Sequence, residues 1–193
     1  GSILAYRAQL KAAAAAGQEL PNITLNDIIL FAASRVLLNH PDLNAHFFDD
    51  HNRRFKHVHL GMAVDTPRGL MVPTLRDADT KTLAKISREA KLLATQAIDG
   101  DINPDLLGGA TFTISNLGAL GIESFTPVIN PPQTGILGVD CITERIRTVD
   151  GAITAYPAMG LSLTYDHRAI DGAPASRFLK YLGGVLAQFP VLL

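Results

Sequence analysis

The sequence predicts a single domain that mixes α-helices with β-strands. Apolar residues recur at helical spacing in the first half of the chain and again at its C-terminal end. Segments in which apolar residues alternate with others lie between and after the predicted helices. The 193 residues, 47% of them hydrophobic, are enough to bury one full core. Because no repeat, low-complexity tract or internal linker divides the chain, one domain is the simplest organisation.

Four segments have the features of helices. The first is alanine-rich and stops at Gly17, and the second begins at an N-cap, Thr24 or Asn26, and ends before Pro41. The third carries an apolar stripe, and the last begins after Asp171, whose carboxylate is placed to cap it. The predicted helices cover residues 3–16, 27–40, 82–97 and 172–189.

The strand predictions rest on alternation and on turn residues. Residues 56–64 and 70–75 form a predicted hairpin with its turn at residues 66–69, and a second hairpin turns at Asp150-Gly151 within residues 142–153. Three further runs, residues 110–115, 134–139 and 158–165, read as strands. A long loop rich in Gly, Pro and Asn separates the first two of these runs, and loops of this length often carry function.

Composition excludes several classes of function. The net charge of -1 is scattered and forms no basic stripe, which argues against nucleic acid and anionic membranes as partners. No apolar run is long enough to span a bilayer. The single cysteine, Cys141, cannot form an internal disulfide, which fits a reducing compartment. We therefore expect a cytoplasmic protein, or one of the mitochondrial matrix if the source is eukaryotic.

The most informative segment is Tyr-Asp-His-Arg-Ala-Ile-Asp-Gly at residues 165–172. His167 is a candidate general base, because imidazole can take and return a proton near neutral pH. The alternative is a hydrogen-bonded structural histidine. Asp171, four residues later, is expected to cap the last helix and to brace the loop that presents His167.

Ser115 closes the predicted strand of residues 110–115 and is followed by Asn and Gly, so its hydroxyl is a candidate stabiliser of an oxyanion. The alternative is an ordinary serine at the end of a strand. The Gly-x-Ser-x-Gly elbow of serine hydrolases is absent, which argues against Ser115 as a nucleophile. His57 and His59 share a strand face but lack a third ligand, so exposed strand histidines are favoured and no metal site is predicted. No phosphate-binding glycine motif of the Walker or dinucleotide type occurs.

The segment at residues 165–172, the Ser115 segment and Phe-Thr-Pro-Val-Ile-Asn-Pro-Pro-Gln at residues 125–133 closely resemble the catalytic domain of the dihydrolipoyl acyltransferases of 2-oxo acid dehydrogenase complexes. Asp-His-Arg-x-x-Asp-Gly is the active-site signature of that family. The resemblance implies a fold like chloramphenicol acetyltransferase, a mixed sheet flanked by helices. It also implies homotrimers with active sites between subunits, which assemble into a hollow cubic or dodecahedral core.

The resemblance implies a role for each residue at a matching position. His167 would be the base that deprotonates a thiol, and Ser115 would donate to the oxyanion across the subunit interface. Asp171 would hold the local architecture. Thr113, Asn116 and Leu117 are expected to contact substrate. The implied reaction moves an acyl group, acetyl in the members most similar around residues 115–122, between a dihydrolipoyl thioester and coenzyme A. Both are substrates, and no permanently bound cofactor is implied. The implied partners are the decarboxylase and dihydrolipoyl dehydrogenase components, as in the pyruvate dehydrogenase complex.

Two departures from the family pattern accompany the resemblance. A basic segment and a strand that usually precede the position of Ile3 are missing, as are the lipoyl and subunit-binding domains, so we expect residues 1–193 to be one catalytic domain without its N-terminal segment. Two other functions share the fold: a catalytically silent core scaffold, and an acetyltransferase for a small hydroxylated acceptor. The joint presence of His167 and Ser115 favours an enzyme over the scaffold.

Overall fold

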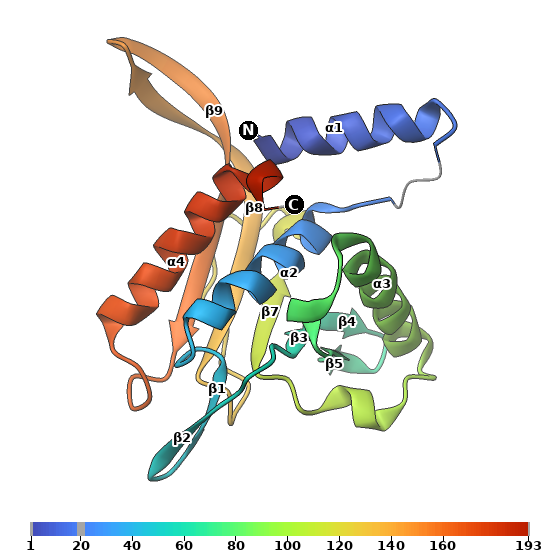
Figure 1. The fold of residues 1–193 in the computed structure, drawn as a ribbon, viewed down its shortest axis with the longest axis vertical. Helices are drawn as coiled ribbons and strands as arrows, with labels where there is room; N and C mark the ends of the chain where they lie inside the picture. Colours follow the sequence, from blue (N-terminus) through green and yellow to red (C-terminus); the bar gives the residue numbers. More distant parts are fainter. Residues whose placement is uncertain (1, 19–21, 193) are drawn as a thin grey trace.

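The computed structural model describes residues 2–18 and 22–192 and shows a mixed five-stranded sheet with helices packed on it (Figure 1). The strand order is β6-β3-β7-β8-β9, with β3, β7 and β8 parallel and the outer strands antiparallel to their neighbours. The strands are Leu60–Met62 (β3), Thr74–Leu75 (β6), Phe112–Asn116 (β7), Gly135–Val149 (β8) and Ala152–Tyr165 (β9). The predicted fold class, a mixed sheet flanked by helices, is confirmed.

The four predicted helices are all present. They are Ser2–Ala15 (α1), Leu25–Val36 (α2), Leu83–Asp99 (α3) and Gly172–Ala187 (α4). Thr24 and Asp27 form a reciprocal capping box at the start of α2, which satisfies two backbone donors that the helix leaves free. Thr82 caps α3, and Gly100 ends it with a φ of 84°, a backbone conformation that favours glycine.

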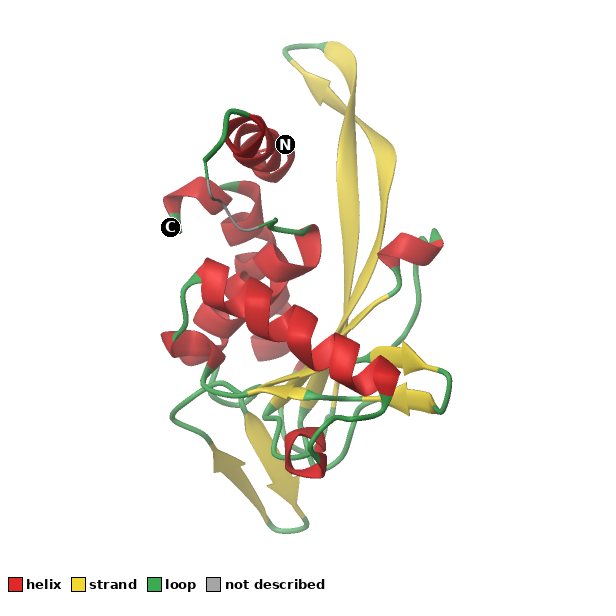
Figure 2. Cartoon of the chain, turned by 90° about the vertical axis from the view of Figure 1, so that its right-hand side faces the viewer, coloured by secondary structure: helices red, strands yellow, loops and turns green. Residues whose placement is uncertain are grey.

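The core lies between the sheet and the helices α2 and α4. Phe112 of β7 and Phe178 of α4 are fully buried and meet edge to face, with ring centroids 5.8 Å apart. Nine of the twelve residues of α2 are buried, which is the pattern of a helix covered on most sides. Figure 2 shows α2 and α4 in one layer beside the sheet. This packing fixes the start of α4, and therefore the loop between β9 and α4.

The longest hairpin joins β8 to β9 and extends past the helices (Figure 2). Asp150 and Gly151 both have positive φ, 51° and 82°, as a two-residue turn with the natural strand twist requires. The predicted turn is confirmed, but the strands around it are continuous with those of the sheet. A register shift between Val139 and Ile142 marks the bulge at which the hairpin leaves the sheet.

The predicted hairpin around residues 66–69 is also present, as Val64–Thr66 (β4) and Gly69–Met71 (β5). The expectation that its first strand begins near Lys56 was wrong, because the ladder starts at Leu60. One further hairpin was not predicted, Ala45–Phe48 (β1) with His51–Arg54 (β2). The short 3-10 helices are Leu37–Asn39 (η1), Ala78–Thr80 (η2), Pro104–Leu107 (η3), Gly118–Leu120 (η4) and Phe189–Val191 (η5).

None of the helices in the described part of the chain combines the length and apolar character needed to cross a bilayer.

Candidate active site

His167 lies in a tight turn between β9 and α4. The carbonyl oxygen of Asp166 accepts hydrogen bonds from the backbone N–H groups of Ala169 and Ile170, at 2.9 and 3.1 Å. The N–H of Asp166 donates to Thr134 O at 2.8 Å, which continues the β8–β9 ladder into the turn. Ile170 is buried, whereas the side chain of His167 is 71% exposed. The local fold therefore presents the imidazole to solvent from a backbone that is held on both sides.

The side chains of Arg168 and Asp166 form an ion pair within this turn. The guanidinium donates from Nε and Nη2 to the two carboxylate oxygens of Asp166, at 3.0 and 2.7 Å, and the Arg168 backbone N–H donates to Oδ1 at 3.0 Å. Such two-pronged pairing is the strong form of the ion pair. The side-chain hydrogen bond from Arg168 lowers the pKa of Asp166 below its usual value, so the ion pair is formed at neutral pH.

The β1–β2 hairpin contacts the same turn. Asn52 Nδ2 donates to Ala169 O at 3.0 Å, and the Arg168 guanidinium carbon lies 4.7 Å from the centroid of the Phe47 ring. Sequence reasoning missed both residues, because they lie more than a hundred positions before the motif that they contact. The alternation in Ala45–Phe48 was too short to reveal the strand.

Asp171 lies beside His167 but does not cap α4 with its side chain. It is the N-cap residue by position, as predicted, and its backbone carbonyl accepts from the N–H of Ala175. The predicted capping hydrogen bond from its carboxylate is absent, so that expectation was wrong. Its Oδ1 lies 3.9 Å from His167 Nδ1, and its side chain is 84% exposed. At that separation the two groups are neighbours without a hydrogen bond.

Ser115 is in β7, on the sheet face opposite the buried Ile114, and is half-buried. Within one chain it does not meet His167. Ser115 of β7 pairs with Gly138 of β8, and Gly138 pairs with Ser162 of β9. Strand β9 ends three residues later, at Tyr165, and His167 lies beyond that end. With strands about 4.8 Å apart and a rise of about 3.3 Å per residue, the two residues are separated by about 10 Å across the sheet and at least about 10 Å along it.

The three residues expected to contact substrate differ in accessibility. Thr113 is buried and donates from Oγ1 to Gln133 Oε1 at 2.7 Å. Leu117 is half-buried, and its N–H donates to Val139 O at 3.0 Å. Asn116 lines a cavity of about 590 Å³ under the start of α2, where its Nδ2 donates to Asn26 Oδ1 at 3.0 Å. Asn116 is therefore the member of the three that faces space for a ligand.

His57 and His59 precede β3 and are held by aspartates, so the expectation of strand histidines was wrong. His57 Nδ1 lies 3.0 Å from Asp79 Oδ2, and His59 Nδ1 accepts from the N–H of Asp77 at 2.9 Å. Burial lowers the pKa of His59, which keeps that nitrogen free to accept. Among residues 2–18 and 22–192, no three His, Cys, Asp or Glu side chains gather in a way that could hold a metal ion.

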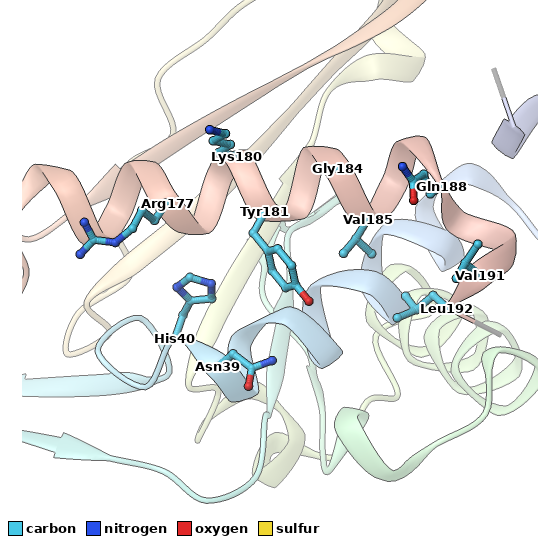
Figure 3. A pocket seen from close by; sticks show the side chains of 10 residues that line it. All are labelled: Asn39, His40, Arg177, Lys180, Tyr181, Gly184, Val185, Gln188, Val191 and Leu192. Carbon is cyan, nitrogen blue, oxygen red and sulfur yellow. The ribbon is translucent and has the colours of Figure 1, made fainter.

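A cavity of about 830 Å³ lies apart from these residues, between η1 and α4 (Figure 3). His40 and Tyr181 face each other there, while Lys180 projects from the other side of the helix (Figure 3). Burial lowers the pKa of His40. None of the residues predicted to form the active site lines this cavity.

Two features define the class of protein. One is a mixed sheet with helices packed on it, and the other is an exposed histidine on a hydrogen-bonded turn that follows β9. The chain belongs to the family described as 2-oxoacid dehydrogenases acyltransferase (catalytic domain), whose model matches residues 1–193.

Individual relatives give a finer comparison. The chain is 43% identical over 192 residues to the dihydrolipoyllysine-residue acetyltransferase component of the pyruvate dehydrogenase complex of Pseudomonas aeruginosa, covering 98% of this chain and 35% of that protein. It is 40% identical to the corresponding component of the acetoin cleaving system of Bacillus subtilis, covering 86% of this chain and 42% of that protein. The chain thus spans well under half the length of these relatives.

Solved structures agree with the family assignment. The crystal structure of the Azotobacter vinelandii dihydrolipoamide acetyltransferase matches with a TM-score of 0.91 and 39% identity, covering 100% of this chain and 79% of that one. That enzyme was studied for the role of a serine, a histidine and an asparagine in its catalytic mechanism. The cubic core of a pyruvate dehydrogenase multienzyme complex matches with the same TM-score, identity and coverage.

Proposed function

We propose that this chain transfers an acyl group, acetyl in the first instance, between a dihydrolipoyl thioester and the thiol of coenzyme A. The observation that carries the proposal is His167, an exposed imidazole on a turn whose backbone is hydrogen-bonded on both sides. The serine and histidine studied in the Azotobacter enzyme are separated by the same number of residues as Ser115 and His167, and its asparagine occupies the position of Asp171. These spacings support the assignment of all three residues.

In the proposed reaction His167 acts as the general base. A thiol with a pKa near about 8.5 is mostly protonated at neutral pH, so removal of its proton makes the sulfur nucleophilic. Nδ1 is the nitrogen nearest Asp171, which leaves Nε2 to take the proton as the sulfur attacks the thioester carbonyl. The Ser115 hydroxyl donates to the oxyanion that forms. The intermediate then expels the dihydrolipoyl sulfur, which takes the proton from His167, and the acyl group remains on coenzyme A.

This chemistry needs two copies of the chain, because the sheet register separates Ser115 from His167 within one copy. We therefore propose a homotrimer in which Ser115 of one subunit faces His167 of the next, built further into a core as in the cubic relative. The decarboxylase and dihydrolipoyl dehydrogenase components would be its partners, and the lipoyl group would arrive on a separate domain. We place the protein in the cytoplasm, or in the mitochondrial matrix of a eukaryote.

The remaining assignments follow from the same site. We propose that residues 1–193 act as a single catalytic domain, with Asn116 contacting substrate in the cavity that it lines and Thr113 and Leu117 shaping that region. We propose that Asp171 holds the local architecture beside His167. No metal and no permanently bound cofactor takes part.

The test is acetyl transfer from acetyl-coenzyme A to free dihydrolipoamide, measured beside transfer to a hydroxylated acceptor such as chloramphenicol. The proposal expects saturable transfer to dihydrolipoamide and none to the hydroxyl. Succinyl- and branched-chain acyl-coenzyme A as donors resolve the acyl group, and acetyl should react fastest. Absence of all thiol transfer by a correctly assembled protein would favour the silent scaffold, and transfer to the hydroxylated acceptor alone would favour the second alternative.

A further inference from the structure

We propose that Asn52 is a positioning residue for His167, acting through the backbone of the turn that carries the histidine. The proposal rests on the assignment of His167 as the base. Asn52 Nδ2 donates to the carbonyl oxygen of Ala169 at 3.0 Å, two residues after His167. Asn52 belongs to β2, far from the motif in sequence, and nothing in the motif itself indicates this contact.

The position of His167 has to be set through its backbone, because its side chain makes few contacts of its own. The imidazole is 71% exposed, its distance to Asp171 is 3.9 Å, and its ring centroid lies 5.7 Å from that of Tyr165. None of these contacts is a hydrogen bond. Groups that fix the peptide units next to His167 therefore decide where its ring nitrogens lie.

The hairpin that delivers Asn52 is itself fixed to the body of the protein. In β1 the N–H of Phe47 donates to Pro132 O at 2.8 Å, the N–H of Thr134 donates to Ala45 O at 3.2 Å, and His46 Nε2 lies 2.8 Å from Ala110 O. These contacts are to the loop before β8 and to the residues before β7, and not to the His167 turn. The hairpin can therefore serve as a support for the turn.

Asn52 and Phe47 act on the turn as a pair. They are directly opposite each other in the β1–β2 ladder, so their side chains share one face. Phe47 lies under the guanidinium of Arg168, and Asn52 binds the carbonyl of the next residue. The two residues that follow His167 are thus held by one cross-strand pair.

The side-chain oxygen of Asn52 indicates that this residue does more than stabilise the fold. Its Oδ1 is buried and has no hydrogen-bond partner in the described part of the chain. A buried acceptor without a partner is unfavourable, so an apolar side chain of similar size would serve the packing equally well. Such local conflicts are typical of functional sites, and here the donor atom of the same amide holds the turn.

The experiment compares Asn52→Leu, which keeps the branching and the number of side-chain heavy atoms and removes the donor, with Arg53→Leu. Arg53 is the next residue in β2, and its guanidinium lies over Phe55 within the hairpin region. Steady-state acetyl transfer is measured with acetyl-coenzyme A and dihydrolipoamide as the varied substrates, with hydrogen exchange of the Ala169 and Ile170 amides as a readout that does not depend on turnover. Both substitutions are also made in a His167→Ala background. Asn52→Asp removes the same donor with less change of shape, and it replaces Asn52→Leu if that variant does not fold.

We expect Asn52→Leu to lower kcat about tenfold, because small displacements of a catalytic group have large effects on rate. KM for acetyl-coenzyme A and for dihydrolipoamide should stay within about twofold, and amide exchange in the turn should accelerate relative to Arg53→Leu. Because Asn52 acts through His167, its substitution should cause no further loss in the His167→Ala background.

The proposal is overturned if kcat of Asn52→Leu stays within twofold of Arg53→Leu, if amide exchange in the turn is unchanged, or if the loss is equal in both backgrounds. Full activity of His167→Ala alone would instead contradict the assigned base, and with it the catalytic part of this proposal. That failure is distinguishable, because it arises without any change at Asn52.

Discussion

Replacement of His167 by alanine should reduce turnover strongly while leaving the fold nearly unchanged. General-base catalysis typically contributes about 10²–10⁴-fold, which corresponds to about 3–5 kcal/mol of activation free energy. The expected loss of stability is far smaller. The side chain is 71% exposed, and its neighbour Asp171, 84% exposed, lies 3.9 Å away, so this surface pair contributes at most about 1 kcal/mol.

The two effects are measured on the same protein. Transfer from acetyl-coenzyme A to dihydrolipoamide gives kcat and KM, and urea denaturation gives the free energy of unfolding. We expect kcat to fall at least about 10²-fold with the unfolding free energy within about 1 kcal/mol of wild type. A folded variant that keeps near-full kcat would refute the assignment of His167 as base. A large loss of stability would mean that the imidazole has a structural role that the contacts do not reveal.

Four further results are expected. Ser115→Ala should lower kcat about 10²-fold with little change in KM, and a loss confined to KM would mean that the hydroxyl binds the ground state. Asp171→Asn should keep kcat within about threefold, because its carboxylate makes no hydrogen bond to His167, whereas a fall near 10⁴-fold would indicate an orienting carboxylate of the triad type. Arg168→Ala should raise the titration midpoint of Asp166 followed by NMR, because the Arg168 hydrogen bond holds the pKa of that carboxyl below the usual value of an aspartate in the wild type. Asp140→Asn should raise the unfolding free energy at pH 7 but not at pH 3. Burial raises the pKa of this carboxyl, whose Oδ1 has no hydrogen-bond partner among the described residues, so its ionisation destabilises the fold as pH rises through that range.

The elements that could be predicted from sequence have strong local signals. The turn at Asp150-Gly151 and the helix start at Thr82 follow from the chemistry of a few adjacent residues, and the structure confirms them. For the second helix the sequence left Thr24 and Asn26 as alternative N-caps, and the structure shows that Thr24 is the cap. The β1–β2 hairpin could not be found in this way. Its strands are four residues long, the second is His-Asn-Arg-Arg, and its turn at Asp49-Asp50 contains no glycine.

The contacts of individual histidine and aspartate side chains were predicted less completely than the sequence motifs that contain them. His57 and His59 have strand-like alternation, but aspartates from the η2 region bind their rings before the ladder begins at Leu60. The helix start after Asp171 was predicted correctly, but the direction of its carboxylate was not, because a side-chain rotamer depends on neighbours that the local sequence does not specify. The support given to His167 by Asn52 depends on a contact between distant parts of the chain, which a single sequence does not reveal.

In the proposed trimer one active site takes Ser115 from one subunit and His167 from the next. A shared site of this kind can be measured by mixing Ser115→Ala and His167→Ala proteins, each of low activity, after dissociation and reassembly. Trimers that contain both variants have interfaces at which an intact Ser115 faces an intact His167, so activity should return in proportion to the mixed species. Native mass spectrometry of the same samples, which separates trimers by the masses of their subunits, establishes that mixed trimers have formed. If demonstrably mixed trimers stay as inactive as the parent variants, or if a monomer shows full turnover, both residues act within one chain and no site is shared between subunits.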